Sequence, residues 1–340
     1  MEEVNGIEFL TLHETPEEKQ HDFVPKTFDE YLGQKELKKK LAVYTQAAKM
    51  RNEPLDHLLL FGPPGLGKTT LSQIMAHVMG TNIKICSGPM MERTGDLVAI
   101  LSSLEARDIL FIDEIHRMPS NVEEVLYNAM EHFRIDVIIG QGAGAKSINL
   151  PIHPFTLVGA TTKSGMISAP LRSRFGIIER LDFYLDDELR DIILQSARFL
   201  NLEISEQSAL HIARCARGTP RIAKKILRRV RDFAQVHNQN IADETLVQTA
   251  LNFLGIDSEG LTKVDLMLLQ KIMDNFNGGP VGLETLASII GEDKDTIESV
   301  YEPFLMQKGY LEKTPRGRQI PAKKLALLKQ RFLGQNTLLR

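Results

Sequence analysis

The first half of the chain alternates between short apolar runs and amphipathic segments. Residues 58–61 (LLLF) form a continuous apolar run, and residues 71–79 behind it carry apolar side chains at helical spacing. Such a run predicts a buried strand, and the spacing after it predicts a helix with one buried face. Two more apolar runs recur at residues 109–112 and 155–160, and residues 82–86 suggest another short strand. Strands that alternate with helices predict an α/β domain built on a parallel sheet.

The second half of the chain has a different pattern, because almost every segment after residue 185 is amphipathic at helical spacing. Predicted helices at about residues 187–200, 206–217 and 221–237 describe an all-α domain. Beyond a break near residue 255, three further helices at about residues 263–276, 283–290 and 293–307 precede two short strands around a PRGR turn. Three helices and a basic β-turn predict a winged helix, a relative of the helix-turn-helix.

These patterns divide the 340 residues into four parts. The length alone favours two or three domains. We predict a loosely ordered polar arm at residues 1–22, a large α/β domain at residues 23–184, a small all-α domain at residues 185–255 and a winged-helix domain at residues 256–340.

Residues 135–150 predict a protruding β-hairpin with a tip rich in glycine and alanine. Exposed apolar residues near such a tip favour a docking site for a partner. A hairpin that folds onto its own domain is the alternative.

The turn after the first predicted strand reads Gly62-x-x-x-x-Gly67-Lys68-Thr69, the pattern of a phosphate-binding loop. Glycines let several backbone N–H groups converge on a phosphate chain, and the following helix adds its unpaired N-terminal amides. We expect Lys68 to reach the β- and γ-phosphates of a nucleotide and Thr69 to ligate Mg²⁺. A chance glycine turn before a helix is the alternative.

Two carboxylates follow the apolar run at residues 109–112. Asp113 and Glu114 would lie at the carboxyl edge of the sheet, where ligands bind in open α/β sheets. We predict that Asp113 holds Mg²⁺ and that Glu114 polarises the water that attacks the γ-phosphate. His116 is interpreted as a structural histidine, with a catalytic role as the alternative.

Three polar residues outside these motifs are further candidates. Thr162 ends a predicted strand and is placed to contact the γ-phosphate or the attacking water. Arg174 lies in a loop, and because an arginine keeps its charge it can stabilise phosphoryl transfer from a neighbouring subunit. Taken alone, an arginine in such a loop is usually a surface residue. Arg221 would begin a helix that faces the nucleotide.

Composition adds one asymmetry. The net charge of the chain is −3, yet the segment from residue 305 onward carries nine basic residues against one acidic residue, Glu312. Such segregation is typical of a polyanion-binding face, with a solvated basic tail as the alternative. No apolar run approaches the ~20 residues that cross a bilayer, and no signal peptide is apparent. We therefore expect a cytoplasmic protein without membrane contacts.

In combination, the motifs GPPGLGKTT, LFIDEIHR, GATT, LRSRFG, GTPRIA, GGPVGL, YEPFL and TPRGR resemble the RuvB family of AAA+ ATPases over about residues 23–335. The resemblance implies a hexameric ring that uses ATP and Mg²⁺ to drive branch migration of Holliday junctions in recombination and DNA repair. It also implies RuvA and the RuvC resolvase as partners, with the hairpin at about residues 135–150 binding RuvA. The alternatives are a clamp-loader-type AAA+ ATPase and a nucleotide-gated DNA-binding scaffold that never hydrolyses ATP.

The resemblance further implies individual roles. Thr162 would be sensor 1, Arg174 an arginine finger acting in trans, and Arg221 sensor 2 acting in cis. Val24 replaces an arginine that is usual in the family, and His132 replaces an acid. The implied sites are Walker A (Gly62, Gly65, Gly67, Lys68, Thr69, Thr70), Walker B (Asp113, Glu114), other nucleotide contacts (Phe23, Val24, Glu131, His132, Phe133, Tyr184) and DNA phosphate contacts (Lys294, Lys313, Arg316, Arg318).

Overall fold

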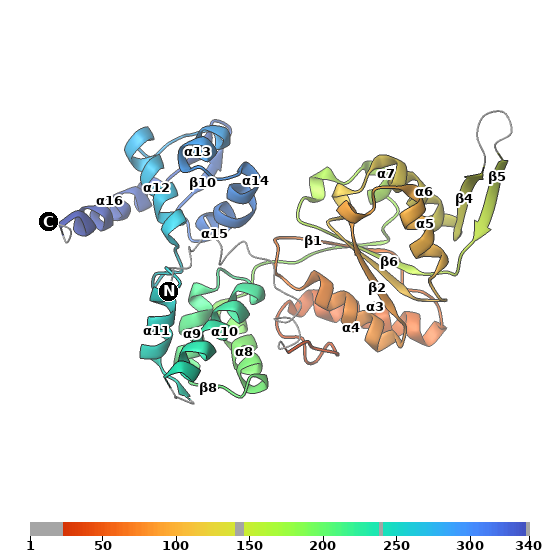
Figure 1. Cartoon of the computed structure of the whole chain (residues 1–340), viewed down its shortest axis with the longest axis horizontal. Coiled ribbons are helices and arrows are strands. Elements are labelled where there is room, and N and C mark those ends of the chain that lie inside the picture. The colour runs from red at the N-terminus through yellow and green to blue at the C-terminus, as the bar shows by residue number, and fades with distance from the viewer. Residues whose placement is uncertain (1–22, 140–145, 238–240, 338–340) are drawn as a thin grey trace. The chain divides into compact units, whose positions relative to one another are not determined.

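The computed structural model of the chain describes residues 23–139, 146–237 and 241–337 (Figure 1). These residues form two compact units, one of residues 24–184 and the other of Phe23 with the described residues from Leu185 onward. Each unit contains its own cluster of buried apolar side chains. The arm predicted at residues 1–22 lies outside the described residues.

The first unit is built on a five-stranded parallel sheet with the strand order β2-β3-β6-β1-β7. Its strands are β1 (Leu58–Phe61), β2 (Ile83–Ser87), β3 (Ile109–Asp113), β6 (Thr156–Thr161) and β7 (Ile177–Arg180). Its helices are α3 (Lys35–Arg51), α4 (Lys68–Met79), α5 (Thr94–Ser102), α6 (Ser120–His132) and α7 (Ala169–Arg172), with 3₁₀ turns η1 (Gly88–Met90), η2 (Ile115–Arg117) and η4 (Ser164–Met166).

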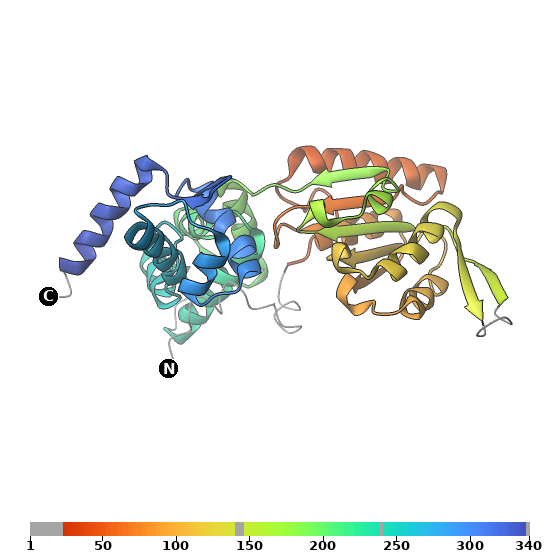
Figure 2. The same ribbon diagram turned by 90° about the horizontal axis from the view of Figure 1, so that it is seen from above.

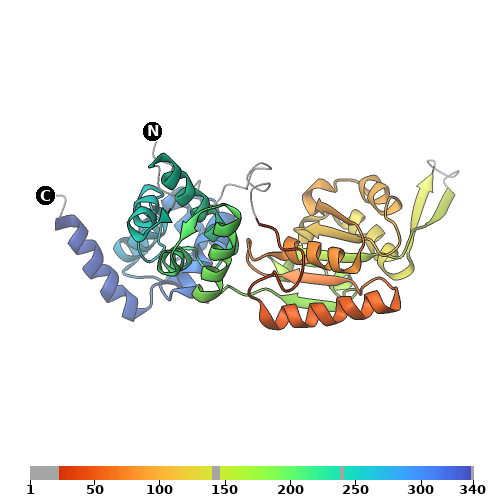
Figure 3. The same ribbon diagram turned by 90° about the horizontal axis from the view of Figure 1, so that it is seen from below.

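Helices cover both faces of this sheet. Leu59, Leu110, Ile112 and Leu157 point to one face, where they pack in a single cluster with side chains of α5, α6 and α7. The alternate residues of the same strands point to the opposite face, where α4 contacts the sheet and α3 lies against α4 (Figures 2 and 3). All six residues of β6 are buried, because this strand lies between β3 and β1. A strand buried on both faces reads as the continuous apolar run seen in the sequence.

The edge strand β7 was not among the predicted strands. Its sequence IIER alternates between half-buried and exposed positions, and two of its four residues are charged. A half-exposed edge strand of this kind gives no continuous apolar run like those of the central strands β1, β3 and β6, so the pattern that marked these three strands is missing here.

The predicted hairpin is present. β4 (Arg134–Ile139) pairs antiparallel with β5 (Lys146–Pro151), and the pair projects away from the sheet of its unit (Figure 1). Ile148 and Leu150 on β5 are exposed. The tip rich in glycine and alanine, residues 140–145, lies outside the described residues.

The second unit begins with a helical domain. Its helices are α8 (Asp186–Phe199), α9 (Glu206–Cys215), α10 (Pro220–Val236) and α11 (Glu244–Phe253), and two-residue strands β8 (Glu203–Ile204) and β9 (Ile241–Ala242) pair beside them. The sequence predicted the first three helices and missed α11. Each helix buries an apolar stripe, as the amphipathic pattern requires.

The rest of the second unit has the composition of a winged helix. It contains α12 (Lys263–Phe276), α13 (Leu283–Ile290), α14 (Lys294–Thr296), the π-helical turn η5 (Ile297–Tyr301), α15 (Glu302–Gln307), β10 (Glu312–Thr314), β11 (Gly317–Gln319) and α16 (Ala322–Thr337). The predicted helix at residues 293–307 is thus three consecutive helical segments, and α16 was not predicted. The hairpin β10–β11 forms the wing, and the fold class expected from the sequence is confirmed for all three domains. Among the described residues, no helix combines the length and the hydropathy needed to cross a bilayer.

Candidate nucleotide-binding site

The glycine-rich turn joins the carboxyl end of β1 to the first residue of α4. Gly62, Gly65 and Gly67 all have positive φ angles, of 146°, 79° and 100°. A Cβ on Gly62 would stand 2.4 Å from the carbonyl oxygen of Leu181, and one on Gly67 would stand 2.7 Å from the Tyr31 hydroxyl. The backbone of this loop is therefore accessible only to glycine at these two positions.

The loop presents donors rather than acceptors to a ligand. α4 begins at Lys68 without a side-chain cap, and its first turn, with Thr69 and Thr70, contains no acidic residue. Its first amides are thus available to an anion at the positive end of the helix. The buried Lys68 ammonium donates to the carbonyl oxygens of Gly62 (2.8 Å) and Pro63 (2.9 Å), which holds it over the loop. These features fit a phosphate chain.

Two tyrosine side chains lie against the loop at Leu66. The hydroxyl groups of Tyr31 and Tyr184 lie 2.7 Å apart, so one donates to the other, and both lie within hydrogen-bond distance of the carbonyl oxygen of Leu66, at 3.2 and 3.1 Å. Tyr184 thus lies beside the loop, as the resemblance implied. Tyr31 had no sequence signal, because nothing local shows that a residue 35 positions earlier returns to this turn.

The two carboxylates lie at the same edge of the sheet. Asp113 is the last residue of β3, and Glu114 follows it with φ 47° and ψ 46°. The left-handed region costs energy for a residue other than glycine and persists where the surroundings enforce it. A Cβ on Gly88 would stand 2.5 Å from the carbonyl oxygen of Glu114, so the glycine that directly follows β2 makes room for this turn.

Thr162 meets Glu114 at this edge. It directly follows β6, the strand between β1 and β3. Its hydroxyl donates to Glu114 Oε2 over 3.1 Å. The structure therefore brings together the phosphate-binding loop, the two acids and Thr162, all of which the sequence placed here.

His116 also contacts this acidic group. Its Nδ1 lies 2.8 Å from Thr161 Oγ1 and 3.1 Å from Glu114 Oε2. Burial lowers the pKa of the His116 imidazole, so the ring is neutral at neutral pH. Since a carboxylate only accepts hydrogen bonds, the proton of the neutral ring belongs on Nδ1. His116 therefore both packs in the structure and touches the carboxylate that we expect to act on water.

The residues present also fit Mg²⁺. Thr69 and Asp113 supply the hydroxyl and carboxylate oxygens that Mg²⁺ prefers, and in nucleotide sites the remaining positions are filled by phosphate oxygens and water. Among the described residues no group of three or more histidine, cysteine, aspartate or glutamate side chains forms a self-sufficient metal site.

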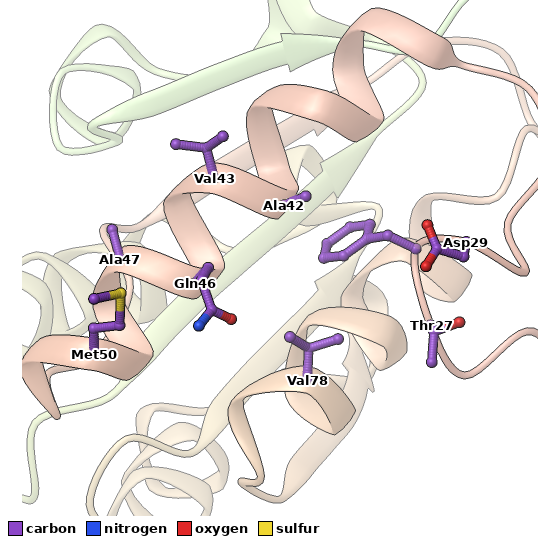
Figure 4. Close-up of a pocket in the computed structure, with 9 residues that line it drawn as sticks. Thr27, Asp29, Ala42, Val43, Gln46, Ala47, Met50 and Val78 are labelled. Carbon is purple, nitrogen blue, oxygen red and sulfur yellow. The ribbon is translucent and has the colours of Figure 1, made fainter.

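A shallow apolar groove elsewhere in the first unit is not part of this site. It lies between α3, the end of α4 and the segment before α3, and Figure 4 shows its lining. Its residues are Thr27, Phe28, Asp29, Ala42, Val43, Gln46, Ala47, Met50 and Val78, and none of them is a predicted site residue.

Arg174 lies near the amino ends of the sheet strands, whereas Lys68 lies at their carboxyl ends. The arginine comes shortly before β7, whose first residue, Ile177, pairs with Leu58 at the amino end of β1. Lys68 follows the carboxyl end of the same strand. A four-residue strand spans about 13 Å, so a subunit's own Arg174 is far from its own phosphate-binding loop.

Glu131, His132 and Phe133 also lie at this amino edge. His57, directly before β1, donates from Nε2 to the carbonyl oxygen of Met130 at 3.1 Å. The ring of Phe133 contacts Phe155, which directly precedes β6. The segment at residues 131–133 is therefore remote from the same chain's loop, and any contact it makes with a nucleotide would be with one bound to a neighbouring subunit.

The other implied nucleotide contacts belong to the second unit or its border. The Phe23 ring packs edge-on against Phe199 of α8, and its carbonyl oxygen accepts from Lys224 of α10 at 2.7 Å. Val24 is exposed. Arg221 is the second residue of α10 and is exposed. Their nucleotide contacts stay predictions.

The four residues expected to touch DNA differ in their surroundings. Arg318 is buried and pairs with Glu302 at 2.6 Å, and both side chains are nearly inaccessible. Lys313 pairs with Glu298 and Lys294 with Glu284, each at 2.9 Å and each exposed. Arg316, at the turn of the wing, is exposed. Arg318 therefore has the geometry of a structural residue, and the other three can reach a phosphate.

Comparison with known proteins agrees with this arrangement. The family model of the Holliday junction DNA helicase RuvB P-loop domain matches residues 23–181, that of the RuvB AAA lid domain matches residues 184–257, and that of the RuvB C-terminal winged-helix domain matches residues 258–329. The chain belongs to the RuvB family. Its fold is also similar to that of the Thermotoga maritima RuvB Holliday junction branch migration motor, with 49% identity, a TM-score of 0.81, and coverage of 90% of this chain and 98% of that one. Two point mutants of the T. maritima RuvB match with the same identity and TM-scores of 0.83 over 98% and 99% of their chains.

Family membership implies that the P-loop domain binds a nucleotide and suggests that the winged-helix domain interacts with DNA. It does not point to the polar residues that support the site from a distance. Tyr31 and His116 are two of these, and a third, Tyr127 of α6, contacts Arg174. A polar stripe at residues 123, 127 and 131, on a helix whose other face is apolar, is the signal that could have found it.

Proposed function

We propose that this RuvB-family chain is an ATP-driven motor that moves Holliday junctions. It assembles as a hexameric ring, engages junction DNA together with RuvA, and serves recombination and repair alongside the RuvC resolvase. The similarity to a T. maritima protein described as a Holliday junction branch migration motor supports this proposal. The arrangement of the candidate site supports its mechanism.

ATP binds with its phosphates on the loop and the amino end of α4. Lys68 contacts the β- and γ-phosphates, and Glu114 polarises the water that attacks the γ-phosphorus. Thr162 fixes the Glu114 carboxylate through the hydrogen bond described above. Mg²⁺, held by Thr69 and Asp113, would neutralise the charge that develops on the phosphates.

One observation supports the shared-site mechanism. Lys68 and Arg174 lie at opposite ends of the strands of the same sheet. An arginine that cannot reach its own nucleotide can complete the site of a neighbour when subunits associate head to tail. Head-to-tail interfaces close into a ring when the rotation from one subunit to the next closes on itself. Arg174 then supplies positive charge to phosphoryl transfer in trans, a contribution worth about 10³–10⁵ in rate where it has been measured in other NTPases.

The second unit converts the nucleotide state into movement of DNA. Arg221, on α10 of the lid, contacts the bound nucleotide. Arg316, Lys313 and Lys294 of the winged helix hold DNA phosphates without reading sequence, so binding weakens as salt rises. The exposed Ile148 and Leu150 of the β4–β5 hairpin offer an apolar surface for RuvA.

The test is branch migration of a synthetic four-way junction. The wild-type protein with ATP should convert the junction to its products, faster when RuvA is present, and Lys68→Ala should abolish the conversion while leaving DNA binding in place. ATP hydrolysis without any junction movement, with or without RuvA, would contradict the proposal and favour a clamp-loader-type activity. DNA binding without hydrolysis would favour a nucleotide-gated scaffold.

A further inference from the structure

The side chain of Arg174 is held by contacts with three neighbouring residues. Its guanidinium NH1 donates to the carbonyl oxygen of Pro170 at 2.7 Å, and its Nε lies 3.2 Å from Glu131 Oε1. The guanidinium carbon stands over the ring of Tyr127, 4.5 Å from the ring centroid. These three contacts, with Pro170, Glu131 and Tyr127, fix the direction in which the arginine points.

The Tyr127 ring is itself anchored. Its hydroxyl donates to Glu123 Oε1 at 2.6 Å and lies 3.1 Å from Ser168 Oγ. Ser168 also donates to Glu123 and caps the amino end of α7 by accepting from Leu171 N. α7 packs against α6 (Figure 1), so the two helices share this hydrogen-bonded joint.

The polar stripe of α6 explains why these contacts occur together. Glu123, Tyr127 and Glu131 follow each other at intervals of four residues, which places them on one face of the helix. The opposite stripe, with Val122, Leu126, Ala129 and Met130, is buried in the core of the unit. A helix fixed by its apolar face can hold the ring and the acid on its polar face at set positions.

We infer that Tyr127 is a positioning residue for phosphoryl transfer in the neighbouring subunit, because its anchored ring sets the guanidinium of Arg174. The inference rests on the proposed function, in which Arg174 acts in trans. A cationic guanidinium is attracted to the electron-rich face of an aromatic ring, and misplacing a catalytic charge by about 1 Å is costly. Glu131 and Pro170 share in holding the arginine, and Tyr127 is the partner, among the three described here, that covers the face of the guanidinium.

The inference predicts that replacing Tyr127 lowers kcat and leaves nucleotide binding unchanged. Tyr127→Leu should lower kcat roughly tenfold, while KM and the affinity of the subunit for nucleotide stay unchanged, since Tyr127 is remote from the phosphate-binding loop of its own chain. Tyr127→Phe keeps the ring over the guanidinium but loses both hydroxyl contacts that anchor it, so its kcat should fall between those of the wild type and Tyr127→Leu. Tyr44→Leu, which removes an exposed tyrosine of α3, is the matched control and should leave both parameters unchanged.

Mixed assemblies test whether the effect acts in trans. Tyr127→Leu mixed with Lys68→Ala should hydrolyse ATP several times faster than the mean of the two separate samples, because Lys68→Ala subunits supply an intact Tyr127–Arg174 pair to the loops of their neighbours. Tyr127→Leu mixed with Arg174→Ala should show no such gain. If Tyr127→Leu does not fold, Tyr127→Met takes its place in the same mixtures.

Lys68→Ala mixed with Arg174→Ala is the control pair for the proposed function. If this pair regains activity and Tyr127→Leu gains nothing from Lys68→Ala, the role of Tyr127 is overturned and the shared site stands. A loss of nucleotide affinity in Tyr127→Leu equal to its loss of kcat would also overturn it. If the control pair itself gains nothing, the shared site of the proposed function fails.

Discussion

Thr162 donates a hydrogen bond to Glu114 Oε2 over 3.1 Å, across the boundary between two neighbouring strands. The acceptor lies on a residue whose backbone is in the left-handed region. His116 Nδ1 lies 3.1 Å from the same oxygen. Thr162 and His116 thus determine where the Glu114 carboxylate points.

Replacing members of this group should slow hydrolysis without weakening ATP binding. Glu114→Gln should lower kcat by about 10²–10⁴-fold, the range typical of a lost general base. Thr162→Val should lower it by about 10-fold or more, the value of one hydrogen bond to a charged group. Steady-state ATPase assays beside equilibrium nucleotide binding measure both effects. An unchanged kcat in Thr162→Val would show that the hydrogen bond does not orient Glu114 during turnover.

The wing of the winged helix offers a matched pair of arginines. Arg316→Ala should weaken duplex DNA binding and reduce the slope of log affinity against log salt by about one unit, while the melting temperature stays constant. Arg318→Ala should instead destabilise the domain by about 3–5 kcal/mol, because it leaves Glu302 buried without its partner.

Fluorescence anisotropy at several salt concentrations and thermal unfolding distinguish the two arginines. A stable Arg318→Ala protein that has lost DNA binding would show that Arg318 contacts DNA after all.

The lid and the winged helix are joined by a buried ion pair. Arg217, just before α10, pairs with Asp265 of α12 at 2.7 Å, and both side chains are nearly inaccessible. The guanidinium also stands 4.4 Å from the ring centroid of Phe304. Arg217→Ala should lower the unfolding free energy by about 3–5 kcal/mol, since the Asp265 charge stays buried without its partner.

Arg221→Ala, four residues further along the chain and exposed, is the control and should change stability little. Chemical denaturation of the full chain measures both variants. Equal stability of Arg217→Ala and wild type would contradict a structural role for the pair.

His57 should make stability depend on pH. Its Nδ1 accepts from Leu157 N at 2.9 Å and its Nε2 donates to the carbonyl oxygen of Met130, so the folded protein requires the neutral ring. Burial lowers the His57 pKa. Below pH about 6.5 the unfolded chain binds a proton that the folded chain does not, and the unfolding free energy falls by up to about 1.4 kcal/mol per pH unit until the folded pKa is passed.

The control for His57 is His57→Gln, which cannot titrate. The unfolding free energies of the two proteins should converge as the pH is lowered from 7.5 to 5, although the variant starts less stable. Parallel pH profiles would show that His57 does not titrate differently in the folded and unfolded states.

The phosphate-binding loop, Asp113, Glu114 and Thr162 were predictable because each lies at the end of a buried strand with a clear apolar run. The apolar run and the residues that follow it are adjacent in the sequence, so no distant contact is needed to recognise them. The edge strand β7 was missed because IIER is half exposed and includes two charges. α16 was missed because it is only weakly amphipathic, whereas α11 was missed although its apolar stripe is as clear as those of the predicted helices. Site residues can therefore be predicted from sequence where they lie at the end of a strand or helix that has a clear apolar pattern.

Other features depend on contacts between distant residues. Arg318 looks like a DNA contact in the sequence, but its partner Glu302 is 16 residues away and only the folded wing brings them together. Glu131 looks like a nucleotide contact, yet the topology of the sheet places it at the opposite edge from Lys68. Tyr127 carries no motif at all, and its relation to Arg174 becomes visible only when α6 and α7 are packed.

The most direct test of the central claim is ATP hydrolysis in an equimolar mixture of Lys68→Ala and Arg174→Ala subunits, each inactive alone. In a ring with head-to-tail interfaces, random mixing should make about one quarter of the sites complete, and the mixture should regain ATPase activity in that proportion. A mixture as inactive as its two components, in assemblies shown to contain both subunits, would contradict a nucleotide site completed by the neighbouring chain.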